Sequence, residues 1–187
     1  MNKMRSKMVK LSEAIADNPE AVFIKRTAAQ SVDDWEGFGR AGHDLVKDLF
    51  VASEDGHAPG RFIMKPNVTS PYPRDQTGEV LTYDGGIVTN AHFVGGMIDG
   101  LHEMGHSDIV VAEGGGGDMQ RNFGDRGYLK MVEERGIELF ALTRAEYEDD
   151  ELNWVEVNGK VAKEMPTVRP INDPGTALIN IPTRKIR

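Results

Sequence analysis

The sequence predicts an α/β fold built on a mostly parallel sheet, and two observations carry this prediction. Short apolar runs of strand length alternate with longer stretches in which apolar residues recur at helical spacing. Turn-forming residues separate these segments. Such alternation is typical of β-α-β units with right-handed crossovers. Because 187 residues suit one folding unit, we expect a single α/β domain over residues 1–187, with helices flanking the sheet.

The N-terminal third is expected to hold a short helix, a strand and a longer helix. Asn18-Pro19 closes the short helix, and the apolar run at residues 21–25 has the length of a strand. Asp33-Asp34 then begins a helix with acidic residues in its first turn. Residues 61–65 form the next strand, which Pro66 ends.

A long loop, residues 66–88, follows and is rich in proline and glycine. Loops of this length inside a compact domain are usually functional or mobile. We expect this loop to be the most mobile internal segment, because few large apolar residues anchor it.

Helical spacing resumes at residues 89–104, where the apolar side chains fall on one face. A glycine-rich loop at residues 113–118 leads into a further helix, which Gly136 stops. We predict a hairpin decoration at residues 153–163, because Asn158-Gly159 suits a type I′ turn. The remaining strands are predicted at residues 109–112, 137–142 and 177–181.

Charge and composition exclude several kinds of partner. Lys and Arg total 22 against 30 Asp and Glu, so the net charge is −8 and we expect neither nucleic acid nor a membrane as a partner. No apolar run approaches the roughly 20 residues of a membrane span, and the basic start lacks the features of a signal peptide. The chain has no cysteine, which excludes a cysteine-bound iron–sulfur cluster and fits a cytoplasmic protein.

Residues 102–106 read His-Glu-Met-Gly-His and match the H-E-x-x-H signature of zinc proteases. Two histidines one turn apart bind zinc only on a continuous helix, whereas Gly105 favours a helix end just before His106. The longer form of the motif needs glycine and histidine where this chain has Ile109 and Ala112. We therefore predict no metal site, and we expect these polar residues to cap the helix.

The four glycines of the 113–118 loop allow two interpretations. A backbone without side chains approaches a phosphate closely at the start of a helix. However, neither the Walker motif nor the dinucleotide-binding motif is present, and Asp118 would repel a phosphate. A flexible turn explains the glycines equally well, so the sequence leaves both interpretations open.

Polar clusters follow three of the predicted strands at the point where each strand ends. If the strands are parallel, the clusters meet at the edge where open α/β sheets bind ligands, and the start of the 89–104 helix joins them. Each residue alone is more often structural, so the prediction of an anion or metabolite site rests on their convergence. We expect Lys65 and Glu113 to approach each other there. The candidate ligand-binding residues are Lys65, Asn67, Thr89, Glu113, Gly114, Asn180 and Lys185.

Several short segments occur in a specific order over roughly residues 21–185. They are Phe62-Ile-Met-Lys-Pro-Asn67, the helix from Thr89 to Leu101-His-Glu-Met-Gly105, Ile109-Val-Val-Ala-Glu-Gly114, Gly127-Tyr128, Gly136-Ile137 and Ala177-Leu-Ile-Asn-Ile-Pro182. Their order and spacing resemble the family called domain of unknown function 362. The resemblance implies a Rossmann-like α/β domain, and some members of that family carry ferredoxin-type iron–sulfur modules.

The chain departs from the family pattern at two places. Members typically read Asn-x-Pro-Lys-x-Lys-x-His after the last strand, whereas here Thr183 replaces the first lysine, Lys185 matches the second and Arg187 replaces the histidine. The usual Thr-His-Pro at the start of the helix appears as Thr89-Asn90-Ala91. The family domain also continues past this length, so the resemblance implies that the chain is either its N-terminal part or a shortened relative.

Three hypotheses about function follow. The first is a small-ligand-binding or redox-accessory domain that binds an anion or metabolite at the predicted edge. The second is an enzyme acting on a carboxylate or phosphorylated metabolite, with Lys65 as an electrostatic clamp and Glu113 as acid or base. The third is a structural subunit that packs against a partner subunit or another copy. No histidine or serine has a visible triad partner, so the sequence leaves open whether the chain is an enzyme.

Overall fold

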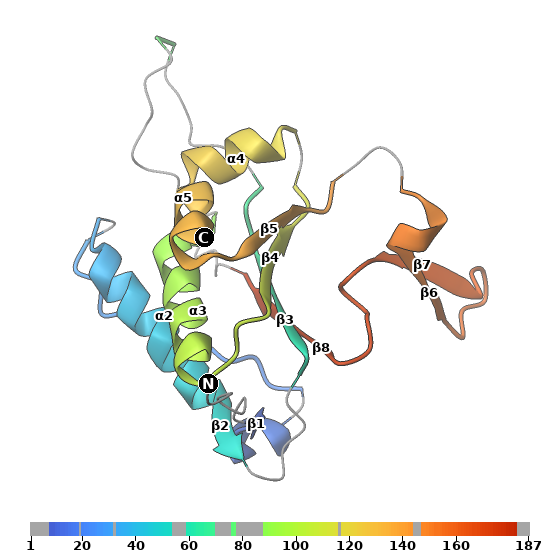
Figure 1. Ribbon diagram of the computed structural model, residues 1–187, viewed down its shortest axis with the longest axis horizontal. Helices are drawn as coiled ribbons and strands as arrows, with labels where there is room; N and C mark the ends of the chain where they lie inside the picture. The colour runs from blue at the N-terminus through green and yellow to red at the C-terminus, as the bar shows by residue number, and fades with distance from the viewer. Residues whose placement is uncertain are drawn as a thin grey trace, which may run out of the picture.

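A four-stranded parallel sheet forms the centre of the computed structural model (Figure 1). The order of strands across it is β5-β4-β3-β8. These strands are β3 (Arg61–Pro66), β4 (Ile109–Glu113), β5 (Glu138–Ala141) and β8 (Thr176–Ile181). The predicted α/β fold with a mostly parallel sheet is confirmed. The structure describes residues 8–18, 20–31, 33–53, 59–69, 76–77, 88–115, 117–143 and 147–182.

Three helices pack on one face of this sheet (Figure 1). They are α2 (Trp35–Leu49), α3 (Ala91–Glu103) and α5 (Tyr128–Arg135). Their apolar side chains form the main core with alternate strand residues, among them Phe62 and Val111, which are fully buried.

The other face of the sheet carries a smaller apolar cluster. Ile63, Val110 and Ala112 are buried there, and Phe140 and Ile171 pack against them. Since Ile171 follows the last hairpin, irregular chain rather than a helix contributes the cover on this side.

Glycines allow α2 and α3 to approach each other closely. A Cβ atom at Gly42 would lie 1.9 Å from the carbonyl oxygen of Phe93, and one at Gly96 would lie 1.9 Å from that of Gly39. No larger residue fits at either position without moving the backbone. The two helices therefore pack against each other with their backbones in close contact.

Side chains and glycines set the ends of the helices. The Asp34 carboxylate accepts a hydrogen bond from the Gly37 backbone, so the predicted start of α2 is confirmed. Asn90 caps α3 in the same way, and Gly136 ends α5 in a left-handed conformation. The helix predicted after the glycine loop is divided into α4 (Met119–Asp125) and α5, with Gly127 at φ 78° between them.

The apolar run at residues 21–25 is not a strand, and this prediction was wrong. Val22 and Ile24 are 84% and 68% exposed, and the run pairs with no described strand. It passes beside α2, where Lys25 forms an ion pair with Asp48 at 2.7 Å. A strand requires a backbone partner, and strand-like composition alone does not supply one.

A small antiparallel sheet and a single helical turn occupy the described N-terminal residues. The strands are β1 (Met8–Leu11) and β2 (Phe50–Ser53), which the sequence did not predict. The turn is α1 (Glu13–Ala16), which confirms the short helix before Asn18-Pro19.

Most of the 66–88 loop lies outside the described residues, so its mobility stays a prediction.

The predicted hairpin exists, but its turn was assigned wrongly. The short helix η1 (Asp149–Glu151) precedes β6 (Leu152–Glu156). β6 pairs with β7 (Glu164–Val168), and residues 157–163 join the two strands. Neither Asn158 nor Gly159 has the positive φ that a type I′ turn requires. The longer loop therefore replaces the expected two-residue turn.

No helix in the described ranges is long and apolar enough to cross a membrane.

Candidate functional site

Lys65 and Glu113 meet at the C-terminal edge of the sheet, as predicted. Lys65 is the penultimate residue of β3, and Glu113 is the last residue of the neighbouring strand β4. The Lys65 Nζ atom lies 2.9 Å from the Glu113 Oε2 atom. The Glu113 side chain is 2% exposed, whereas that of Lys65 is 37% exposed. A buried carboxylate is thus neutralised by an ammonium group that still reaches solvent.

Asn180 lies beside this pair, on the other neighbour of β3. Asn180 of β8 is the register partner of Lys65, so both side chains leave the sheet on the same face. Asn180 is exposed. Lys185, the last predicted site residue, lies outside the described residues.

Thr89 lies at the same edge, but its hydroxyl group holds the fold together. The Oγ1 atom donates a hydrogen bond of 2.7 Å to the carbonyl oxygen of Ile181 and accepts one of 3.0 Å from the backbone of Asn67. The Thr89 backbone in turn donates to the Asn67 carbonyl oxygen at 2.9 Å. Thr89 and Asn67 therefore link the ends of β3 and β8 to the start of α3, and Thr89 is buried.

Two further polar residues at this edge, Tyr128 and Arg126, were missed. The Tyr128 hydroxyl group donates to the Thr89 carbonyl oxygen at 2.9 Å, and its side chain is fully buried. Burial raises the pKa of Tyr128 well above 10.0, with a further contribution from the charge of Glu113, while Arg126 acts in the opposite direction. The sequence could have indicated this role, because Tyr128 lies in the apolar stripe of a helix and a buried phenol usually requires a hydrogen-bond partner.

The geometry of the glycine loop favours a structural role. A Cβ atom at Gly115 would lie 2.9 Å from the carbonyl oxygen of Val68, and one at Gly114 would lie 3.0 Å from the Leu142 side chain. The Asp118 side chain accepts a hydrogen bond from the Arg121 backbone and so caps α4 itself. The glycines therefore permit close packing of the loop against its neighbours, and the start of α4 is occupied by a carboxylate.

The structure also shows how the His-Glu-Met-Gly-His segment is used. α3 ends at Glu103, and Gly105 has a φ of 88°, so the predicted helix end is confirmed. Glu103 pairs with Lys47 at 2.7 Å and with His43 at 3.0 Å. His106 is buried with its ring 5.1 Å from that of Phe62. Within the described residues no group of three potential ligands could hold a metal ion, and the absence of zinc stays a prediction.

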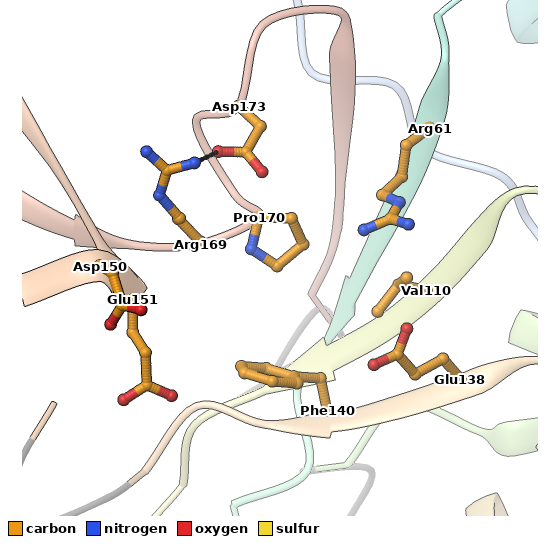
Figure 2. A pocket seen from close by; sticks show the side chains of 9 residues that line it. All are labelled: Arg61, Val110, Glu138, Phe140, Asp150, Glu151, Arg169, Pro170 and Asp173. Atoms are coloured by element: carbon orange, nitrogen blue, oxygen red, sulfur yellow. Dashed lines mark hydrogen bonds and ion pairs between the residues drawn. The ribbon is translucent and has the colours of Figure 1, made fainter. Parts of the chain in front are cut away.

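The structure also contains a cavity of about 310 Å³, and Figure 2 shows the side chains that line it. It faces the side of the sheet opposite the helices, near the start of β3 and β5. Its lining residues are Arg61, Val110, Glu138, Phe140, Asp150, Glu151, Arg169, Pro170 and Asp173. Since Lys65 and Glu113 are at the other end of their strands, the cavity and the predicted site are separate.

Comparison with known proteins assigns the family. Residues 63–186 match the model of the family described as Domain of unknown function (DUF362), which is more than half of the chain. No curated protein and no solved structure matches the chain significantly. The matched region contains all four strands of the parallel sheet except the first two residues of β3, together with α3, α4 and α5. The chain belongs to the DUF362 family.

Proposed function

We propose that this domain binds a small anionic metabolite through Lys65 at the C-terminal edge of the sheet. The observation that carries the proposal is the geometry of the ammonium group. It has three N–H donors, and among the contacts of the described residues its one partner is Glu113. Because the Lys65 side chain is 37% exposed, the remaining donors face solvent and are free to bind a carboxylate or a phosphate.

The position of Lys65 in the fold supports the same proposal. Parallel α/β sheets bind ligands at the C-terminal ends of their strands, and Lys65 is in a central strand, flanked by β4 and β8. The exposed amide of Asn180 lies next to it and offers both a donor and an acceptor. A cation with a neighbouring amide suits an oxyanion better than it suits a metal ion or an apolar group.

Binding is better supported than acid–base catalysis by Glu113. Its side chain is 2% exposed, and the Lys65 ammonium group already binds its carboxylate. A general acid or base must reach the substrate directly or through one water molecule. We therefore assign Glu113 a positioning role, in which it orients the Lys65 head group toward the ligand.

The decisive experiment removes the ammonium group without leaving a buried charge. Lys65→Ala alone would leave the buried Glu113 carboxylate without its counter-charge, which would lower the free energy of unfolding by roughly 3–5 kcal/mol. We therefore compare Glu113→Gln with the double variant Lys65→Met/Glu113→Gln. Inorganic phosphate and succinate are titrated by calorimetry, and thermal unfolding checks that each variant folds. Lys130→Ala serves as the control, because Lys130 is 81% exposed on α5.

We expect Glu113→Gln to bind at least one probe as tightly as the unchanged protein does, because its ammonium group is no longer neutralised. The double variant should bind that probe at least about ten-fold more weakly, which corresponds to a loss of about 1.4 kcal/mol or more of binding free energy. The Lys130→Ala control should behave like the unchanged protein. Equal affinities in the two test variants, or no binding of either probe by the unchanged protein, would refute the proposal.

A further inference from the structure

The cavity of Figure 2 lies between the open face of the sheet and the chain segments that lead into and out of the β6–β7 hairpin. The sheet contributes side chains from β3, β4 and β5, and the opposite wall comes from η1 and from the turn after β7. Its volume of about 310 Å³ is at the lower end of the range of small-ligand pockets, roughly 300–1,000 Å³. The cavity therefore has room for one small metabolite.

Some of the charges that line the cavity are already matched within the protein. The Nη1 atom of Arg169 lies 3.4 Å from the Asp173 carboxylate. The Glu151 side chain accepts a hydrogen bond of 3.1 Å from the Glu148 backbone, as part of a capping box. These groups hold the turn and η1 in place, so the recognition of a ligand falls to the other charged groups.

Three charged groups of the lining have unused hydrogen-bonding capacity. Glu138 and Asp150 are exposed, and in the part of the chain that the structure describes neither carboxylate has an ion-pair or hydrogen-bond partner. Arg61 binds Asp108 through its Nε atom at 2.8 Å, which leaves the N–H donors of its terminal nitrogens without an acceptor among the described residues. The cavity thus offers two free carboxylates and one set of free guanidinium donors.

The three groups are arranged in a definite order. Arg61 and Glu138 are on β3 and β5, which β4 separates, so their strands lie roughly 10 Å apart. Within the described residues the two side chains form no ion pair with each other, and both lie beside Val110 (Figure 2). Asp150 is across the cavity, with Phe140 between (Figure 2). One end of the cavity therefore carries both signs of charge, the middle is apolar, and the far end is acidic.

We infer that this cavity binds a basic α-amino acid, with the charges and the aliphatic chain of L-lysine. The α-carboxylate accepts hydrogen bonds from the terminal nitrogens of Arg61, and the α-ammonium group pairs with Glu138. The aliphatic chain packs on Phe140, and the terminal cation reaches Asp150. Each of the three unmatched groups then gains a partner of opposite sign. Arg61 and Lys65 are near opposite ends of β3, so the inference does not depend on the proposed function.

Three analogues of L-lysine each lack one of the recognised charges. Cadaverine has no carboxylate and leaves the Arg61 donors unmatched. 6-Aminohexanoate has no α-ammonium group for Glu138, and L-norleucine has no terminal cation for Asp150. Because a hydrogen bond to a charged group contributes strongly to binding, each analogue should bind at least about five-fold more weakly than L-lysine.

The test measures binding of L-lysine and the three analogues to the full chain by calorimetry. The variants are Arg61→Gln, Glu138→Gln and Asp150→Asn, and thermal unfolding checks that each of them folds. Arg61→Gln leaves no buried charge behind, because the Asp108 side chain is 51% exposed. Glu133→Gln is the control, since it makes the same charge change as Glu138→Gln at an exposed position on α5.

We expect saturable binding of L-lysine, weakened at least about five-fold by each of the three cavity variants and unchanged by the control. Glu138→Gln should leave the affinity for 6-aminohexanoate unchanged, because that compound lacks the α-ammonium group. Asp150→Asn should likewise leave the affinity for L-norleucine unchanged. Absence of L-lysine binding, or an analogue that binds as tightly as L-lysine, would overturn the inference. Binding that is insensitive to the cavity variants would place the amino acid elsewhere on the protein and would overturn it too.

Discussion

The Thr89 hydroxyl group donates a hydrogen bond of 2.7 Å to the carbonyl oxygen of Ile181, across 92 residues of sequence. The Thr89 Oγ1 atom also accepts a hydrogen bond from the Asn67 backbone at 3.0 Å. One buried side chain therefore joins the ends of β3 and β8 at the candidate site. Lys65 and Asn180, the penultimate residues of these two strands, lie next to this connection.

Thr89→Val should destabilise the protein markedly, because valine has the same shape but cannot form either hydrogen bond. The Asn67 amide and the Ile181 carbonyl group would each lose a partner, at roughly 1–3 kcal/mol apiece. We expect the free energy of unfolding to fall by about 2–4 kcal/mol in urea denaturation. Thr89→Ser keeps the hydroxyl group and should cost much less. A loss in Thr89→Val no greater than that in Thr89→Ser would contradict the prediction, because the two hydrogen bonds would then contribute no more than the γ-methyl group.

Gly96→Ala should prevent the normal packing of α2 on α3. The new methyl group would lie 1.9 Å from the Gly39 carbonyl oxygen, which belongs to the backbone and cannot rotate away. We expect a loss of about 3 kcal/mol or more, measured by thermal or chemical unfolding.

Gly39→Ala is the matched control on α2, since the nearest atom to its added Cβ is the His92 carbonyl oxygen at 3.8 Å. Alanine is favoured over glycine inside a helix, so this variant should gain up to about 1 kcal/mol. If both glycine substitutions had the same effect, close approach of the helices would not explain the glycines.

Stability should fall below neutral pH in a way that depends on His106. This side chain is buried against Phe62, and its Nε2 atom has no hydrogen-bond partner within the part of the chain that the structure describes. Burial lowers the pKa of His106 below its ordinary value of 6.5. The unfolded chain therefore binds a proton at this residue more readily than the folded chain does.

It follows that the contribution of neutral His106 is complete above pH 6.5 and is lost as pH falls toward its lower folded pKa. The free energy of unfolding should decrease by up to about 1.4 kcal/mol per pH unit in that range. Urea denaturation at a series of pH values, compared with His106→Leu, measures this. The leucine variant should show a flatter profile, and an identical slope would assign the acid sensitivity to other groups.

Lys65 and Glu113 illustrate what could be predicted about the candidate site. Both stand at the ends of apolar runs that read clearly as strands, and parallel strands bring their C-terminal ends together. Their contact therefore followed from strand order without knowledge of any side-chain packing. The role of Thr89 was only half predicted, since its place at the edge was expected but its two hydrogen bonds were not.

By itself, the sequence determined the strands of the central sheet, their parallel direction and the ends of α2 and α3, because apolar spacing, helix caps and helix-stopping glycines act within a few residues. Tertiary structure alone decided that residues 21–25 remain unpaired, that Tyr128 binds Thr89, and that Gly42 and Gly96 lie against the backbone of a neighbouring helix. Pairing, burial and close approach depend on what lies opposite a segment. That information is carried by distant residues, so the pattern of the segment alone cannot supply it.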